Sequence, residues 1–136
     1  AGGRIWLDPS IRSVYFARST LSELMRQYRR YGFWKWKMLR RYPHTLRWRQ
    51  ALPPLFVLSL FGLALFSLFF PWARPALAGE LLLYFSIMIL AGLHSAVRQR
   101  IPWLVLGLPL AIPAMHIAWG GGLLWSILES SMKKNG

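Results

Sequence analysis

The sequence predicts a mainly α-helical membrane protein, with a short N-terminal β-hairpin-like piece, one amphipathic interfacial helix and about three transmembrane helices. The 136-residue chain is 55% hydrophobic, yet it carries 17 Lys and Arg against 4 Asp and Glu, a net charge of +13. A membrane protein with a basic cytoplasmic face combines these properties easily. Residues 1–50 hold 12 of the bases, and long apolar runs follow. We therefore divide the chain into a basic cytoplasmic or interfacial segment, residues 1–50, and a transmembrane domain, residues 51–136.

The N-terminal region has two short β-prone runs, residues 4–7 and 13–16, on either side of the turn signal "DPS". Two strands alone are marginal in water, so we expect them to complete a larger sheet outside this chain. The chain begins with Ala1 rather than Met and contains no cysteine, which excludes disulfides. We expect a processed or truncated piece of a longer protein.

A helix is predicted to begin in "STLSEL", where Thr20 and Glu23 have the spacing of a capping box. It should run to about Tyr42 and stop before Pro43. Its second half interleaves large aromatics with bases, a composition typical of a helix lying at a membrane surface. The residues predicted to hold it at that surface are Phe33, Trp34, Lys35, Trp36 and Lys37.

Three apolar runs are predicted to span the membrane, near residues 52–70, 81–97 and 101–128. About 20 residues of helix cross a hydrocarbon core roughly 30 Å thick. The third run is long and contains three prolines and Gly120–Gly122, so we expect it to be kinked or to have an interfacial tail. The Lys and Arg distribution predicts a cytoplasmic N-terminal half. It leaves open the side of Lys133 and Lys134, since three spans would put them outside and an even number inside.

The basic and aromatic stretch "QYRRYGFWKW" also has the composition of a nucleic-acid-binding patch. It leads directly toward a membrane span, however, and a basic flank is expected there. We therefore expect no nucleic-acid partner. The four acids, Asp8, Glu23, Glu80 and Glu129, are scattered, and there is no DxD or phosphate loop. The chain is not expected to hold a catalytic residue, a metal ion or a cofactor of its own.

Two histidines, His94 and His116, lie in apolar segments. Either could ligate a haem or a chlorophyll, or hydrogen-bond a neighbouring helix. His116 is the deeper of the two and the better functional candidate, because polar groups there are costly. His94 lies near the bases that follow its segment, as an interfacial polar group would. The Gly120–Gly122 run predicts close helix packing or a helix break.

The motif Q-x-x-R-[aromatic], formed by Gln27, Arg30 and Tyr31, resembles the Q-x-x-R-W motif of membrane-bound family 2 glycosyltransferases. Further features on both sides of this motif occur in the same order as in members of the succinoglycan-biosynthesis type. The resemblance covers essentially the whole chain. The further features are Arg18 before the Thr20-Leu21 helix start, "RQYRRYG" at residues 26–32, "RRYP" at residues 40–43, and H-x-x-x-G-x-G formed by His116, Gly120 and Gly122.

The resemblance implies a role for each residue of the motif helix. Arg30 would contact the donor diphosphate and stabilise it as the leaving group. Gln27 would hydrogen-bond where donor and acceptor meet, and Tyr31, in the place of the usual Trp, would stack beneath the acceptor. Arg18 and Arg26 would be further contacts to phosphate or lipid headgroups. The nucleotide-binding domain, its DxD and the catalytic base would lie upstream of Ala1, so this chain alone is expected to be inactive.

The resulting hypothesis is the membrane anchor and diphosphate-contacting segment of a glycosyltransferase in a bacterial-type inner membrane. The parent would use a nucleotide-sugar with Mg or Mn and a lipid-linked saccharide acceptor at the cytoplasmic face. Membrane lipids and the missing N-terminal catalytic domain would be its partners. The alternative is a small non-enzymatic basic subunit that binds lipid, pigment or protein in a larger membrane complex. An in-frame Glu-Asp and DxD upstream would distinguish the two, and until then the enzymatic status stays open.

Overall fold

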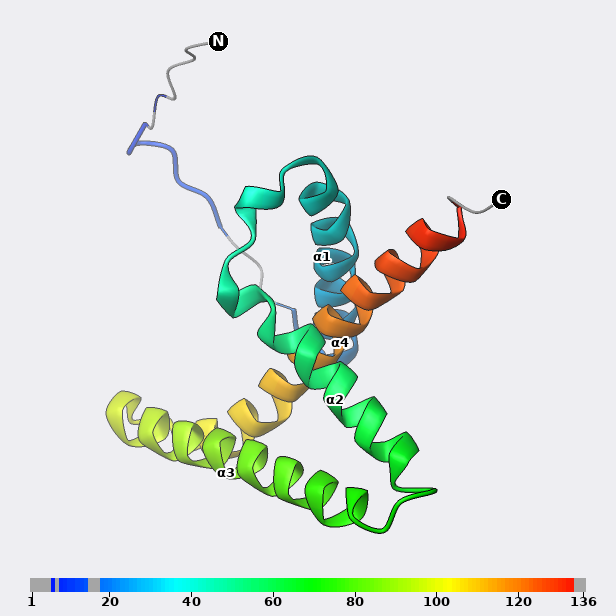
Figure 1. Cartoon of the computed structure of the whole chain (residues 1–136). Coiled ribbons are helices and arrows are strands. Elements are labelled where there is room, and N and C mark those ends of the chain that lie inside the picture. Colours follow the sequence, from blue (N-terminus) through cyan, green and yellow to red (C-terminus); the bar gives the residue numbers. More distant parts are fainter. Residues whose placement is uncertain (1–5, 7, 15–17, 134–136) are drawn as a thin grey trace.

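The computed structural model describes residue 6, residues 8–14 and residues 18–133. These residues form four α-helices and two short 3-10 turns (Figure 1). The helices are α1 (Leu21–Arg41), α2 (Leu52–Phe66), α3 (Ala73–Gln99) and α4 (Leu104–Met132), with η1 (Pro43–Thr45) and η2 (Trp48–Gln50) between α1 and α2. The mainly α-helical prediction is confirmed. Three helical segments, η2–α2, α3 and α4, are long and apolar enough to cross a membrane.

The N-terminal strand pair is not supported. Residue 6 and residues 8–14, the described part of that region, contain no strand. The turn is present: the backbone N–H and the hydroxyl of Ser10 donate to Asp8 Oδ1 at 2.9 and 2.7 Å, and these bonds lower the pKa of Asp8. The rest of both runs lies outside the described residues. A strand needs a partner, and within the described chain no third strand is present to complete a sheet.

Helix α1 begins where the sequence indicates. Thr20 Oγ1 accepts a hydrogen bond from the backbone N–H of Glu23 at 3.2 Å. The reciprocal half of the capping box is replaced, since the Glu23 carboxylate accepts from Ser19 Oγ at 3.4 Å. The helix ends at Arg41, and Pro43 opens the 3-10 turn η1. Proline cannot continue the helical hydrogen bonding, which explains the boundary.

The apolar helices differ from the expected spans at their ends. α2 stops at Phe66, in a turn that precedes Pro71, and α3 begins already at Ala73, so that Glu80 lies inside the helix. α4 continues through Pro109, Pro113 and the glycine run as one helix, and the expected break is absent. Its 29 residues give a length of about 43 Å. That exceeds the roughly 30 Å of a hydrocarbon core.

Helix α4 is the centre of the fold, because it packs against all three other helices. Its beginning lies against α3, where Gly92 faces the backbone of Leu104 and Val105. Farther along, Gly120 faces the backbone of Pro53 in α2. The last part of α4 runs beside α1, as Figure 1 shows in blue-cyan and orange. Within the described residues α1 and α2 do not pack on each other, although they follow one another in the chain.

Glycines bring the backbones of α1 and α4 into direct contact. A Cβ added to Gly32 would overlap the carbonyl of Trp119, and one added to Gly122 would overlap the carbonyl of Arg29. Gly121, between the two packed glycines of α4, faces open space. Of the two predicted roles of this run, close packing is the one observed, as in small-residue contacts between membrane helices.

Candidate functional site

The five residues of the predicted substrate contact lie around one surface hollow on the first half of α1. The hollow has a volume of about 340 Å³. Four of them come from successive turns of α1, and Arg18 reaches the hollow from the segment before the helix. The lining residues are Arg18, Glu23, Arg26, Gln27, Arg30 and Tyr31. Sequence analysis therefore identified side chains that are neighbours in space, and it missed only Glu23 as a member of this set.

Gln27 is the central residue of this hollow. Its Oε1 accepts a hydrogen bond from Arg18 Nε at 3.0 Å, and its Nε2 donates to the hydroxyl of Tyr31 at 2.6 Å. The Tyr31 ring also meets the ring of Tyr28 edge-on, with centroids 5.7 Å apart. Gln27 thus holds one arginine and one aromatic side chain in fixed positions. Tyr31 remains 53% exposed, so its ring is open to a ligand.

The hollow carries an excess of positive charge. Three arginines line it against the single carboxylate of Glu23. Within the described part of the chain the ion pair present joins Lys133 to Glu129, so Arg18, Arg26 and Arg30 are not neutralised by one. Guanidinium groups are permanently charged and present paired N–H donors that match phosphate oxygens. The chemistry of the hollow is therefore suited to a phosphate-bearing ligand.

Arg30 also borders a second hollow, between α1 and α4. This cavity of about 570 Å³ is lined by Arg29, Arg30, Phe33, Gly122 and Trp125. Sequence analysis did not identify Arg29 or Trp125. The pairing of α1 with α4 that brings them together is a tertiary contact. The glycines indicated close packing, but nothing in the sequence indicated which helix would pack against them.

The predicted membrane-surface residues are divided between two environments. Trp34 is 62% exposed, and Lys37 Nζ lies 4.4 Å from the ring centroid of Phe33 and 4.8 Å from that of Trp34. Trp36 and Lys35 are half-buried instead, and Lys35 Nζ donates to the carbonyl of Thr45 at 3.3 Å. Lys35 therefore ties α1 to the following loop, whereas Trp34 and Lys37 are available to lipid.

His116 joins two of the apolar helices. Its Nδ1 lies 2.9 Å from the hydroxyl of Tyr84 in α3, and Tyr84 stacks on Phe56 of α2 with centroids 4.2 Å apart. This arrangement corresponds to the predicted hydrogen bond to a neighbouring helix. His94 is exposed on α3. Among the described residues no three His, Asp or Glu side chains come together as a group of possible metal ligands.

No protein family, curated protein or solved structure matches the chain. Its function is therefore argued from the arrangement of its residues.

Proposed function

We propose that this chain is the membrane anchor and diphosphate-contacting segment of a family 2 glycosyltransferase that transfers sugar from a nucleotide donor to a lipid-linked acceptor. One observation carries the proposal. The residues that fit the family motif, together with two further arginines, line a single cationic hollow on α1. Arg18 lies nine positions before Gln27 and donates a hydrogen bond to the Gln27 side chain. A chance match of the five-letter motif alone would not require this contact.

The proposed chemistry is electrostatic. Arg30 contacts the diphosphate of the donor and stabilises the negative charge that develops on the leaving nucleoside diphosphate. Gln27 is a positioning residue, since its amide is engaged by Arg18 and Tyr31. The half-exposed ring of Tyr31 provides a surface on which a sugar ring of the acceptor stacks. Arg18 and Arg26 add positive charge that concentrates anionic ligands at this end of α1.

The catalytic base and the divalent cation belong to a nucleotide-binding domain outside these residues. Inverting transfer needs a base to take the proton of the acceptor hydroxyl. Glu23 is the carboxylate in the hollow, and it accepts a hydrogen bond from Ser19 Oγ beside the helix N-terminus. The part of this chain is to bind the diphosphate and to hold that domain at the membrane.

The proposal includes an orientation in which α1 and both ends of α4 lie at the cytoplasmic face of an inner membrane. Helix α1 carries seven Lys and Arg, which favours the cytoplasmic side. Lys133, at the end of α4, lines a hollow with Lys37 and Arg40 of α1. Since α4 is one continuous helix, both of its ends can lie at that face only if α4 lies along the face, so α2 and α3 make the two crossings in this orientation. This orientation corresponds to an even number of crossings, with Lys133 on the cytoplasmic side.

The first test is the reading frame that precedes Ala1. An in-frame Glu-Asp and DxD would support the enzyme, and a start codon immediately before Ala1 would contradict it. The second test uses the complete protein reconstituted in bilayers, with Arg30→Ala compared with Arg12→Ala, which removes an exposed arginine outside the hollow. Arg30→Ala should abolish transfer without reducing membrane insertion. Normal turnover in Arg30→Ala would refute the diphosphate role.

The second candidate function is a non-enzymatic basic membrane subunit. The observation that favours it is the direct packing of α1 on α4, a contact made without any part of a further domain. A subunit of this kind would bind lipid or protein but not a nucleoside diphosphate. Uridine diphosphate titrated into the chain in phosphatidylcholine nanodiscs distinguishes the two. Binding that Arg30→Ala weakens supports the transferase, and the absence of binding supports the subunit.

A further inference from the structure

We infer that a further cationic hollow, between the C-terminal ends of α1 and α4, binds the phosphodiester headgroup of an anionic membrane lipid. The hollow has a volume of about 680 Å³ and is lined by Lys37, Arg40, Arg41, Glu129, Ser130 and Lys133. The inference is independent of the glycosyltransferase proposal, because it requires only that the chain lies in a membrane.

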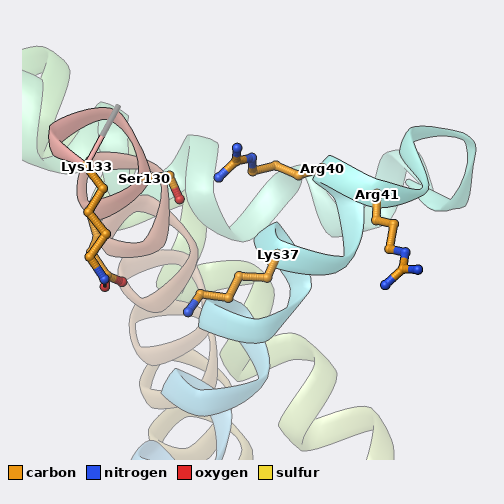
Figure 2. A pocket seen from close by; sticks show the side chains of 6 residues that line it. Lys37, Arg40, Arg41, Ser130 and Lys133 are labelled. Carbon is orange, nitrogen blue, oxygen red and sulfur yellow. Dashed lines mark hydrogen bonds and ion pairs between the residues drawn. The ribbon is translucent and has the colours of Figure 1, made fainter. Parts of the chain in front are cut away.

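Two cations of α1 extend toward this space, and Lys133 borders it from α4. Figure 2 shows Lys37 and Arg40 extending from α1 toward the end of α4, where Lys133 and Ser130 lie, whereas Arg41 points away. Lys37 and Arg40 are three residues apart, so they share one face of α1. A phosphate between the helix ends would be held mainly by these two side chains of α1.

The charge of the hollow favours an anion. Four bases line it against one acid, and Glu129 is already paired with Lys133 at 2.6 Å. That ion pair compensates the charge of Lys133, and Arg41 points away (Figure 2), so Lys37 and Arg40 are the free cations that extend toward the hollow. Lys37 is also oriented by its contacts with the rings of Phe33 and Trp34. Arg40 supplies paired N–H donors, whereas the Ser130 hydroxyl at the same rim donates to the carbonyl of Ser126 at 2.7 Å.

The surroundings indicate that the anion is attached to a lipid. Large apolar side chains are exposed within one turn of the lining residues, among them Trp34 and Met38 of α1 and Leu128 and Met132 of α4. A soluble phosphate would gain nothing from these side chains. The acyl chains of a lipid would cover them while its headgroup lies among the cations, as at other basic sites for anionic lipids.

The experiment measures lipid selectivity with the whole chain. The purified protein is given equal amounts of phosphatidylglycerol and phosphatidylcholine, and native mass spectrometry counts each lipid bound. Phosphatidylglycerol should be enriched in the wild type. The double variant Lys37→Gln/Arg40→Gln should reduce that enrichment, by roughly fivefold for each cation and about 30-fold for both. The control Arg47→Gln/Arg98→Gln removes the same charge from exposed positions outside the hollow and should reduce the enrichment clearly less.

Each result decides the inference. Absence of enrichment in the wild type, or equal losses in both double variants, would overturn it in favour of unspecific charge attraction. A competition arm adds inorganic phosphate or glycerol 3-phosphate in excess. Complete displacement of the lipid would assign the hollow to a soluble phosphate and would also overturn the inference.

A second variant applies if Lys37→Gln/Arg40→Gln loses helical content by circular dichroism. Ser130→Ala/Lys133→Gln changes the same hollow from α4, and unchanged enrichment in that variant would likewise contradict the site.

Discussion

The hydroxyl of Tyr84 lies 2.9 Å from Nδ1 of His116 and joins α3 to α4 across 32 residues of sequence. The same tyrosine ring stacks on Phe56, so the three apolar helices meet at this point. Tyr84→Phe removes the hydroxyl and keeps the ring. It should lower the free energy of unfolding in mixed micelles by about 1 kcal/mol, the usual range for a hydrogen bond between membrane helices.

The control for this prediction is a double-mutant cycle with His116→Phe. Because the two side chains share one hydrogen bond, the losses should not add, and the coupling energy should be about 0.6 kcal/mol or more. Strictly additive losses would show that the bond does not contribute to stability.

The glycine run of α4 provides a matched pair of substitutions one residue apart. Gly122→Ala adds a Cβ that overlaps the backbone of Arg29, whereas Gly121→Ala adds one that meets open space. The first should destabilise the protein by about 1–3 kcal/mol, as overpacking does. The second should be neutral or stabilise it by up to about 1 kcal/mol, since alanine favours a helix. Thermal unfolding followed by near-ultraviolet circular dichroism measures both, and similar melting temperatures would contradict the α1–α4 contact.

Replacement of Arg30 by lysine tests bidentate recognition separately from charge. Lysine keeps the positive charge but loses the planar pair of donors. Arg30→Lys should weaken binding of uridine diphosphate in nanodiscs about tenfold, a difference of roughly 1.4 kcal/mol. Arg12→Lys, outside the hollow, should leave binding unchanged. Equal affinity in the two variants would mean that the hollow attracts the nucleotide through charge alone.

The proposed orientation is open to cysteine labelling, because the natural chain contains no cysteine. Single substitutions Arg47→Cys, Leu68→Cys and Lys133→Cys report on the loop after α1, the turn between α2 and α3, and the end of α4. With a membrane-impermeant maleimide, Lys133→Cys should react from the same side as Arg47→Cys. Leu68→Cys should react from the opposite side. Labelling of Lys133→Cys together with Leu68→Cys would indicate three full crossings.

The helices were largely predictable from the sequence because each has a local signal. Thr20 caps α1, Pro43 follows its end, and uncharged runs form the core of α2, α3 and α4. Span ends were less predictable. Arg74 donates from its Nε to the carbonyl of Ser67 and lies within the first turn of α3, so a charge near a membrane face did not end the helix.

The hollow on the first half of α1 was predictable for a local reason, whereas the hollow between the C-terminal ends of α1 and α4 was not. Gln27, Arg30 and Tyr31 occupy neighbouring turns of one helix, so their sequence spacing already puts them together. Lys133 and Lys37 are far apart in the sequence and meet only because α1 packs on α4. The expected strand pair has turn chemistry at Asp8 and Ser10, but residue 6 and residues 8–14, the described part of that region, contain no strand, and a turn alone does not make a sheet.

The role of α4 has a consequence for biosynthesis. α1 and α2 are attached to α4 through different glycines, Gly122 and Gly120, and they do not pack on each other. A ribosome makes α4 after the other three helices, so α1 has no docking partner while they are being inserted. We expect nascent chains that end before Gly120 to leave α1 accessible to protease, and chains that extend past Met132 to protect it. Assembly of this region is then completed after translation of its last helix rather than in the order of the sequence.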